Sequence, residues 1–218
     1  DGSRVSKGWF KVVAAEYMNY EKNNDDEDAW YYADGNGRIY TAEFKTIKGK
    51  KYAFREDGRM VSGLKFIKQN NTGDITSVVA DDNSGHPFDT EDDFVTNAPY
   101  WNEKGYYCYY FGSGDDGAMR TNKINITIDG DNFNFEKTGS HKGAGKTGEK
   151  DKKYYQSGML LKAGSDEKYQ VVKTLDANFD SNDDGEAISG YLKLDDVKAF
   201  LDEVNVTSTT DPSTVTLS

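Results

Sequence analysis

The sequence predicts a mainly β protein: an elongated solenoid of stacked β-hairpins, with insertions and one C-terminal helix. Three observations support this fold class. They are an internal repeat with an offset of 21 residues, a composition rich in aromatic side chains, and turn dipeptides that contain glycine. A unit of this length is too small to bury a core alone, so such units must stack on their neighbours.

The repeat relates residues 30–41 to residues 52–63. Aligning Gly37 with Gly58 gives the offset of 21 residues. The same offset superimposes residues of equal or similar type: Tyr31 on Tyr52, Arg38 on Arg59, Ile39 on Met60 and Thr41 on Ser62. Asn36-Gly37 and Asp57-Gly58 are typical hairpin-turn dipeptides, because their residues accept positive φ angles. Each repeat is therefore predicted to contain an aromatic strand, a turn and a second short strand.

The composition narrows the class of protein. Of the 218 residues 35% are hydrophobic and 13% are aromatic, which favours strands and stacked rings over helical bundles. A net charge of −11 argues against a nucleic-acid partner, since phosphate binding needs a basic surface. Cys108 is the single cysteine, so an internal disulfide is excluded. No apolar run reaches the length of a membrane span.

The first part of the chain divides into a strand, an insertion and the two clear repeats. Residues 8–13 are predicted to form a strand, and the polar residues 14–28 form a surface insertion. The two repeats occupy residues 29–67. Residues 68–104 are polar and irregular, and they are interpreted as a second, longer insertion.

Hairpin character resumes at residues 105–111, with a turn at Asp116-Gly117 and about two extra residues relative to the first repeats. Weaker copies continue, so residues 1–172 are assigned to the array. Residues 173–206 are assigned to an acidic loop followed by a helix at 193–204, and residues 207–218 to a linker or tail. The helix is predicted from helical spacing of four apolar residues: Leu194, Val197, Leu201 and Val204.

The motifs over residues 8–67 resemble a known family. The order of these motifs is similar to that in the cell-wall-binding repeats of Gram-positive surface proteins, which are the choline-binding and glucan-binding modules. The motifs are Gly8-Trp9, then Trp30-Tyr31-Tyr32, then the spaced glycine with Ile39 or Met60. The resemblance implies a solenoid of hairpins with aromatic pockets between successive hairpins. In choline-binding members these pockets hold quaternary ammonium groups of wall teichoic acids. Glu43 and Leu64 occupy positions that the family usually gives to Trp.

Trp9, Trp30 and Tyr52 are the candidate ligand-binding residues. By the resemblance, they fill the two Trp positions of one unit and the Tyr position of the next. An aromatic cage would bind a cation through the negative faces of its rings. The alternative is that the three rings only pack the core of the array, as each repeat requires for its stability.

An alternating series of oxygen-bearing side chains suggests a candidate calcium site. The series consists of Asp176, Asn178, Asp180, Asn182 and Asp184. From Asp180 it matches the first positions of a calcium loop, but Tyr191 stands where the loop needs its bidentate acid. We therefore expect at most weak calcium binding, and a solvated acidic loop is the alternative. No other cofactor is expected.

The sequence favours a non-catalytic binding module that attaches its parent protein to cell-wall polymers, either choline-substituted teichoic acid or a glycan. Its expected location is secreted or on the cell surface, bound to the wall. Two alternatives stay open: a structural or adhesive spacer without a small-ligand site, and a fragment of a wall hydrolase. Gly143–Thr147 does not form a phosphate loop, because Ser140 stands where the first glycine is needed. No pairing of a nucleophile with a base emerges from the sequence.

Overall fold

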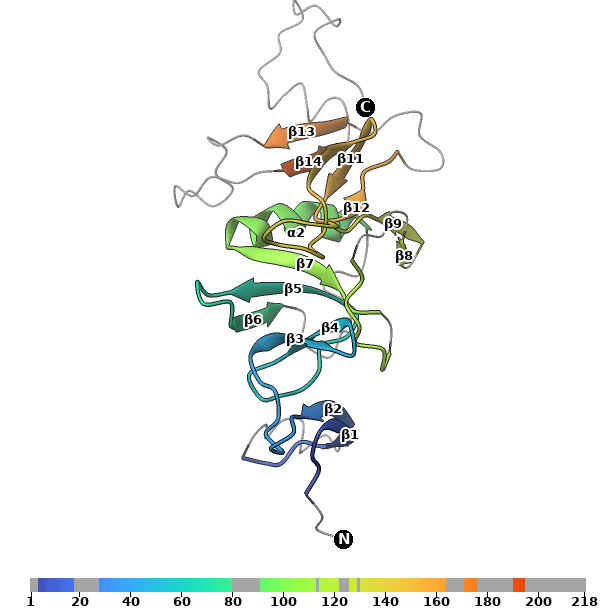
Figure 1. Ribbon diagram of the computed structural model, residues 1–218. Helices are drawn as coiled ribbons and strands as arrows, with labels where there is room; N and C mark the ends of the chain where they lie inside the picture. Colours follow the sequence, from blue (N-terminus) through green and yellow to red (C-terminus); the bar gives the residue numbers. More distant parts are fainter. Residues whose placement is uncertain are drawn as a thin grey trace, which may run out of the picture. The chain divides into compact units, whose positions relative to one another are not determined.

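The computed structural model describes residues 4–17, 28–79, 91–112, 114–121, 126–128, 130–163, 171–175 and 190–194. The prediction of a mainly β protein is confirmed, since the described elements are strands in small antiparallel sheets and one helix (Figure 1). The chain divides into two compact units. The first contains Asp1–Pro87 and Cys108–Arg120, and the second contains Phe88–Tyr107 and Thr121–Ser218.

The first unit is built from hairpins that follow one another along the chain. The strands are β1 (Gly8–Val13), β2 (Asp28–Ala33), β3 (Glu43–Ile47), β4 (Lys50–Phe54), β5 (Leu64–Gln69), β6 (Ile75–Val79) and the part of β7 (Tyr106–Tyr110) that begins at Cys108. Strands β1 and β2 pair, β3 and β4 pair, and β5 lies between β6 and β7. The predicted strand at 8–13 is confirmed, and Asp28 belongs to β2 rather than to an insertion.

One backbone pattern recurs at the start of β1, β3 and β5. The residue before each strand has a positive φ, and its N–H donates to the carbonyl of the residue that closes the hairpin. The three bonds are Lys7 to Asp34 at 2.8 Å, Ala42 to Arg55 at 2.9 Å and Gly63 to Gly112 at 2.9 Å. The donors Ala42 and Gly63 are 21 residues apart, and so are the acceptors Asp34 and Arg55, so the sequence repeat corresponds to a repeat of backbone geometry.

The turns predicted at Asn36-Gly37 and Asp57-Gly58 are confirmed. Gly37 has φ 72° and Gly58 has φ 86°, in the left-handed region that only glycine enters at low cost. Isolated bridges close the two turns at equivalent places, from Ala33 to Ile39 and from Phe54 to Met60.

The turn at Asp116-Gly117 closes the third hairpin. Gly117 has φ 62°. The closing bond from Arg120 N–H to the carbonyl of Tyr110 spans two residues more than the bond from Val61 to Ala53 in the second hairpin. The two extra residues predicted for this turn are therefore confirmed.

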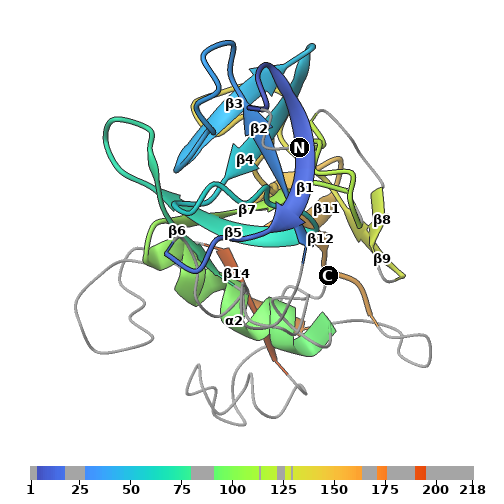
Figure 2. The same cartoon turned by 90° about the horizontal axis from the view of Figure 1, so that it is seen from below.

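The second unit combines a helix with two small sheets. Its elements are α2 (Glu91–Glu103), β8 (Ile126–Ile128), β9 (Asp131–Phe133), β10 (Gly148–Lys150), β11 (Lys153–Gln156), β12 (Met159–Leu160), β13 (Val171–Leu175) and β14 (Gly190–Leu194). One sheet has the order β10-β11-β12-β9-β8, and β13 pairs with β14. Strand β14 lies against α2 (Figure 2).

The prediction that residues 68–104 are irregular is wrong for the described part of this segment, whereas their assignment as an insertion into the array stays a prediction. Strand β5 extends to Gln69, β6 follows, and α2 begins at Glu91. The helix was missed because its apolar stripe is narrow. Phe94, Val95 and Ala98 are buried, but polar residues surround them in sequence. Pro99 inside the helix further conceals it, because proline removes one helical hydrogen bond and normally interrupts a helix.

The predicted helix at 193–204 is wrong where it can be checked. Its first two residues, Lys193 and Leu194, belong to β14 and pair with Val172 and Val171. The remainder, 195–204, lies outside the described residues. The pairing with β13 provides the physical reason, because the ladder of hydrogen bonds between the two strands holds Lys193 and Leu194 in an extended backbone.

Candidate binding site

The structure brings Trp9, Trp30 and Tyr52 together in the first unit. The ring centroids of Trp9 and Trp30 lie 6.5 Å apart, and those of Trp9 and Tyr52 lie 4.8 Å apart. Trp9 and Trp30 share one face of the first hairpin, because Trp9 pairs with Tyr32 while Trp30 pairs with Lys11, two residues along β1. Tyr52 reaches the same cluster from β4 of the second hairpin.

The rings of this cluster pack against one another. Trp9 also contacts Tyr32, with centroids 5.0 Å apart, and Phe54, with centroids 5.9 Å apart. Its contacts with Trp30, Tyr32 and Tyr52 are edge-on, the geometry favoured by the ring quadrupoles. Tyr52 is only 9% exposed. The cluster thus has the geometry of core packing, and binding of a ligand by all three rings stays a prediction.

The pairing register corrects the assignment of Glu43 to a family Trp position. Trp9 pairs with Tyr32, and Phe44 pairs with Ala53, which lies 21 residues after Tyr32. The structural counterpart of Trp9 in the second hairpin is therefore Phe44. Phe44 packs on Tyr109 and Phe111, so the aromatic position recurs on a neighbouring residue.

Trp30, unlike Trp9 and Tyr52, also lines a hollow of about 150 Å³, together with Met60 of the same cluster. Asp28 and Asp115 contribute carboxylates to this hollow, and Arg55 and Arg59 contribute guanidinium groups. The indole N–H of Trp30 is buried and has no hydrogen-bond partner among the described residues.

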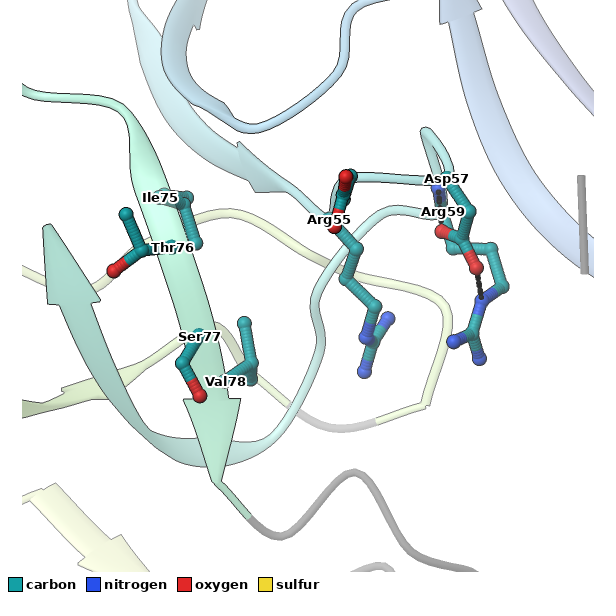
Figure 3. A pocket seen from close by; sticks show the side chains of 8 residues that line it. Arg55, Asp57, Arg59, Ile75, Thr76, Ser77 and Val78 are labelled. Atoms are coloured by element: carbon teal, nitrogen blue, oxygen red, sulfur yellow. Dashed lines mark hydrogen bonds and ion pairs between the residues drawn. The ribbon is translucent and has the colours of Figure 1, made fainter.

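A larger hollow of about 490 Å³ lies between the turn after β4 and strand β6. The turn lines one side of this hollow with Arg55, Glu56, Asp57 and Arg59, and β6 lines the other side with residues 75–78 (Figure 3). The same two arginines therefore border both hollows. The sequence had singled out the turn that carries these arginines but not strand β6, so this hollow was not predicted.

Fixed contacts hold the charged groups of the turn. Asp57 accepts from the backbone N–H of Arg59 at 3.0 Å and from Nε of Arg59 at 2.6 Å. Arg55 donates from Nη1 to the carbonyl of Met60 at 3.0 Å. Burial, followed by the charge of Asp57, raises the pKa of Tyr31 above its ordinary value, although Arg59 and Arg55 oppose the shift. The phenol of Tyr31 is thus close enough to feel this group of charges.

The residues of the predicted calcium site, Asp176 to Asp184, lie outside the described residues. Within the described residues no group of three or more His, Cys, Asp or Glu side chains is arranged to hold a metal ion. No helix in the same part of the chain is both long and apolar enough to cross a bilayer.

No family model matches the chain, and no curated protein is similar to it. Several solved structures match at low TM-score, and they are choline-binding proteins and wall endolysins or autolysins. The modular Cpl-1 endolysin, complexed with a peptidoglycan analogue, is 19% identical with a TM-score of 0.26, over 55% of this chain and 20% of its own. CbpF in complex with ipratropium is 19% identical with a TM-score of 0.22, over 72% of this chain and 49% of its own.

The modular autolysin LytC from Streptococcus pneumoniae is 14% identical with a TM-score of 0.23, over 87% of this chain and 34% of its own. The chain thus spans between about a fifth and a half of the length of these three proteins.

Proposed function

We propose that this chain is a non-catalytic module that binds cell-wall polymers, either choline-substituted teichoic acid or a glycan, and thereby holds its parent protein at the cell surface. The observation that carries the proposal is the repeated hairpin. The residues that resemble wall-binding repeats, 8–67, fold into hairpins with a recurring backbone pattern and with aromatic rings packed between the first two. A repeated unit suits a repeated polymer, because each added contact raises avidity without a new kind of site.

Trp30 is the ring through which this module would contact its ligand. It is partly buried in the aromatic cluster and also borders the hollow that contains Asp28 and Asp115. A cation over an indole face gains about 0.5 to 2 kcal/mol. Asp28 and Asp115 add to that attraction, whereas Arg55 and Arg59, which line the same hollow, oppose it. The same ring offers an apolar face to a sugar.

A spacer without a small-ligand site is the second candidate, and the packing of Trp9 favours it. Trp9 contacts four other rings, so its faces are already covered within the protein. If the remaining rings act in the same way, the aromatic residues only hold the hairpins together.

The test is sedimentation of the full chain with purified Gram-positive cell walls, in the presence and absence of free choline. We expect binding by the wild-type chain and loss of binding by Trp30→Ala. Tyr109→Ala is the control, because Tyr109 is buried in the first unit away from the hollow and packs on Phe44. It should lower the thermal midpoint but leave wall binding intact. Failure of the wild-type chain to bind walls, choline or isolated glycans would leave the spacer function.

A further inference from the structure

We propose that the hollow between the 55–59 turn and strand β6 binds an anionic group, a carboxylate or a phosphate, through the guanidinium groups of Arg59 and Arg55. That this group belongs to a wall polymer rests on the proposed function, whereas the site itself rests on the geometry of the hollow (Figure 3).

Arg59 is held so that its terminal nitrogens remain for a ligand. Its Nε donates to Asp57, and the two side chains are only 15% and 13% exposed. Among the described residues this carboxylate is the sole side-chain partner of Arg59, so Nη1 and Nη2 have no acceptor there. A guanidinium fixed through Nε presents its two terminal donors in the geometry that a carboxylate or phosphate accepts. Little side-chain entropy is then lost when the ligand binds.

Arg55 provides the second guanidinium on the same wall. Its Nη1 donates to the carbonyl of Met60, which anchors the side chain across its own turn. Figure 3 shows the Arg55 and Arg59 side chains extending in the same direction from the turn, and both line the hollow. Guanidinium donors from two side chains at one cavity favour a ligand that carries negative charge on several oxygens.

Strand β6 forms the opposite wall and adds a hydroxyl. It is the edge strand of its sheet, and Ile75 N–H fixes it to the second hairpin through the carbonyl of Ala42 at 2.7 Å. The hydroxyl of Thr76 already donates to the carbonyl of Lys68 at 3.3 Å. The hydroxyl of Ser77 has no partner within the described part of the chain, so it is a further donor for the ligand. A volume of about 490 Å³ admits a group of the size of a sugar unit.

Two carboxylates also line the hollow, and they act differently. Asp57 and Arg59 offset each other's charge in their ion pair, which leaves the terminal N–H groups of Arg59 as donors rather than a full unit of free charge. Glu56 is exposed, and water screens its charge, but it still repels an anion. Removal of this charge should therefore strengthen binding, which gives a variant with an effect opposite in sign to that of the arginine variants.

The first turn supplies a matched control. Arg38 holds the position in that turn that Arg59 holds in the second, at the same 21-residue offset. Arg38 is exposed and does not line the hollow. A nonspecific attraction of arginine for polyanions would depend on Arg38 and Arg59 alike, whereas a site depends only on Arg59.

The experiment measures binding of the full chain to poly(glycerol phosphate), to polygalacturonate and to neutral dextran by isothermal titration calorimetry. We expect both polyanions to bind and dextran to bind more weakly. The ratio between the two polyanions distinguishes a phosphate source from a carboxylate source. Arg59→Gln and Arg55→Gln should each weaken polyanion binding roughly tenfold to a hundredfold, the range for a lost charged hydrogen bond. Glu56→Gln should bind more tightly, and Arg38→Gln should be unchanged.

Circular dichroism of each variant shows whether the hairpins are retained. If Arg59→Gln unfolds, Arg55→Gln and Glu56→Gln still decide the question. Equal polyanion binding by wild type, Arg55→Gln and Glu56→Gln would overturn the anion site, even if the chain binds cell walls. Polyanion binding with the expected variant pattern, but no sedimentation with walls, would support the site and refute the proposed function.

Discussion

The backbone N–H of Met60 donates to the carbonyl of Trp30 at 2.8 Å, which ties the turn of the second hairpin to the second strand of the first. The same bond recurs one hairpin later, from Met119 to Lys51 at 2.8 Å. Lys51 follows Trp30 by the repeat offset. Successive hairpins are thus joined by equivalent hydrogen bonds, and the side chains beside these bonds must pack closely for the bonds to form.

Gly117→Ala should destabilise the first unit. A Cβ at Gly117 would come closer than 3.0 Å to the side chain of Met60, which is buried in the aromatic cluster and would have to shift toward the hollow of about 150 Å³ that it also lines. Overpacking of this kind costs about 1 to 3 kcal/mol. The midpoint of urea unfolding measures the loss.

Gly114→Ala is the control for that substitution. Gly114 also has a positive φ, 58°, so alanine there carries a similar backbone strain, but a Cβ would meet nothing within 4 Å. The difference between the two variants isolates the contact with Met60. Equal losses of stability would show that backbone strain alone explains the effect.

Local signals were sufficient to predict the hairpins of the first unit. Asn36-Gly37 and Asp57-Gly58 mark turns by the φ angles that their own residues adopt, and that information is contained in a few neighbouring residues. Helix α2 could not be predicted in this way. Its apolar stripe is short and consists of Phe94, Val95 and Ala98. Pro99 lowers the stability of the isolated helix, and packing against β11 and β14 of the same unit compensates for that loss.

Trp9→Ala should lower the free energy of unfolding by about 3 kcal/mol, the lower end of the range for loss of a large aromatic residue from a core. The lower end applies because Trp9 is only partly buried, although it contacts four rings: Trp30, Tyr32, Tyr52 and Phe54. Phe10→Ala is the matched control, since Phe10 is the next residue on the opposite face of β1 and stacks on Tyr31. We expect a smaller loss for Phe10→Ala, and equal losses would contradict a central role of Trp9 in the cluster.

The candidate sites were predictable to different degrees. The proximity of Trp9, Trp30 and Tyr52 follows from hairpin register, which a repeat and its turns specify. The hollow at Arg55 and Arg59 was not predictable, because its second wall is β6. That strand pairs with β5 through the turn at 70–74, where Asn70 accepts from two backbone N–H groups and Gly73 has φ 92°, a local signal that was missed in the sequence. The bond from Ile75 to Ala42, which brings β6 to the second hairpin, has no such signal.

The last prediction concerns Tyr31 and alkaline pH. Burial and the charge of Asp57 raise the pKa of Tyr31, so the folded protein holds the phenol proton more tightly than the unfolded chain does. The stability from this difference is fully present below the ordinary tyrosine pKa of about 10 and is lost as the pH rises through the folded pKa. The urea midpoint of wild type should therefore fall above about pH 10, and that of Tyr31→Phe should fall less.

At pH 7 the same substitution should be neutral or stabilising by up to about 1 kcal/mol. The hydroxyl of Tyr31 is buried and lacks a hydrogen-bond partner among the described residues, so its removal relieves a desolvated polar group. Tyr17→Phe serves as the control, because Tyr17 is 89% exposed and its substitution should change the alkaline profile little. If Tyr31→Phe and wild type lose stability in parallel from pH 8 to 11.5, the titration of Tyr31 does not contribute to alkaline unfolding, and the decline belongs to other groups that deprotonate in the same range.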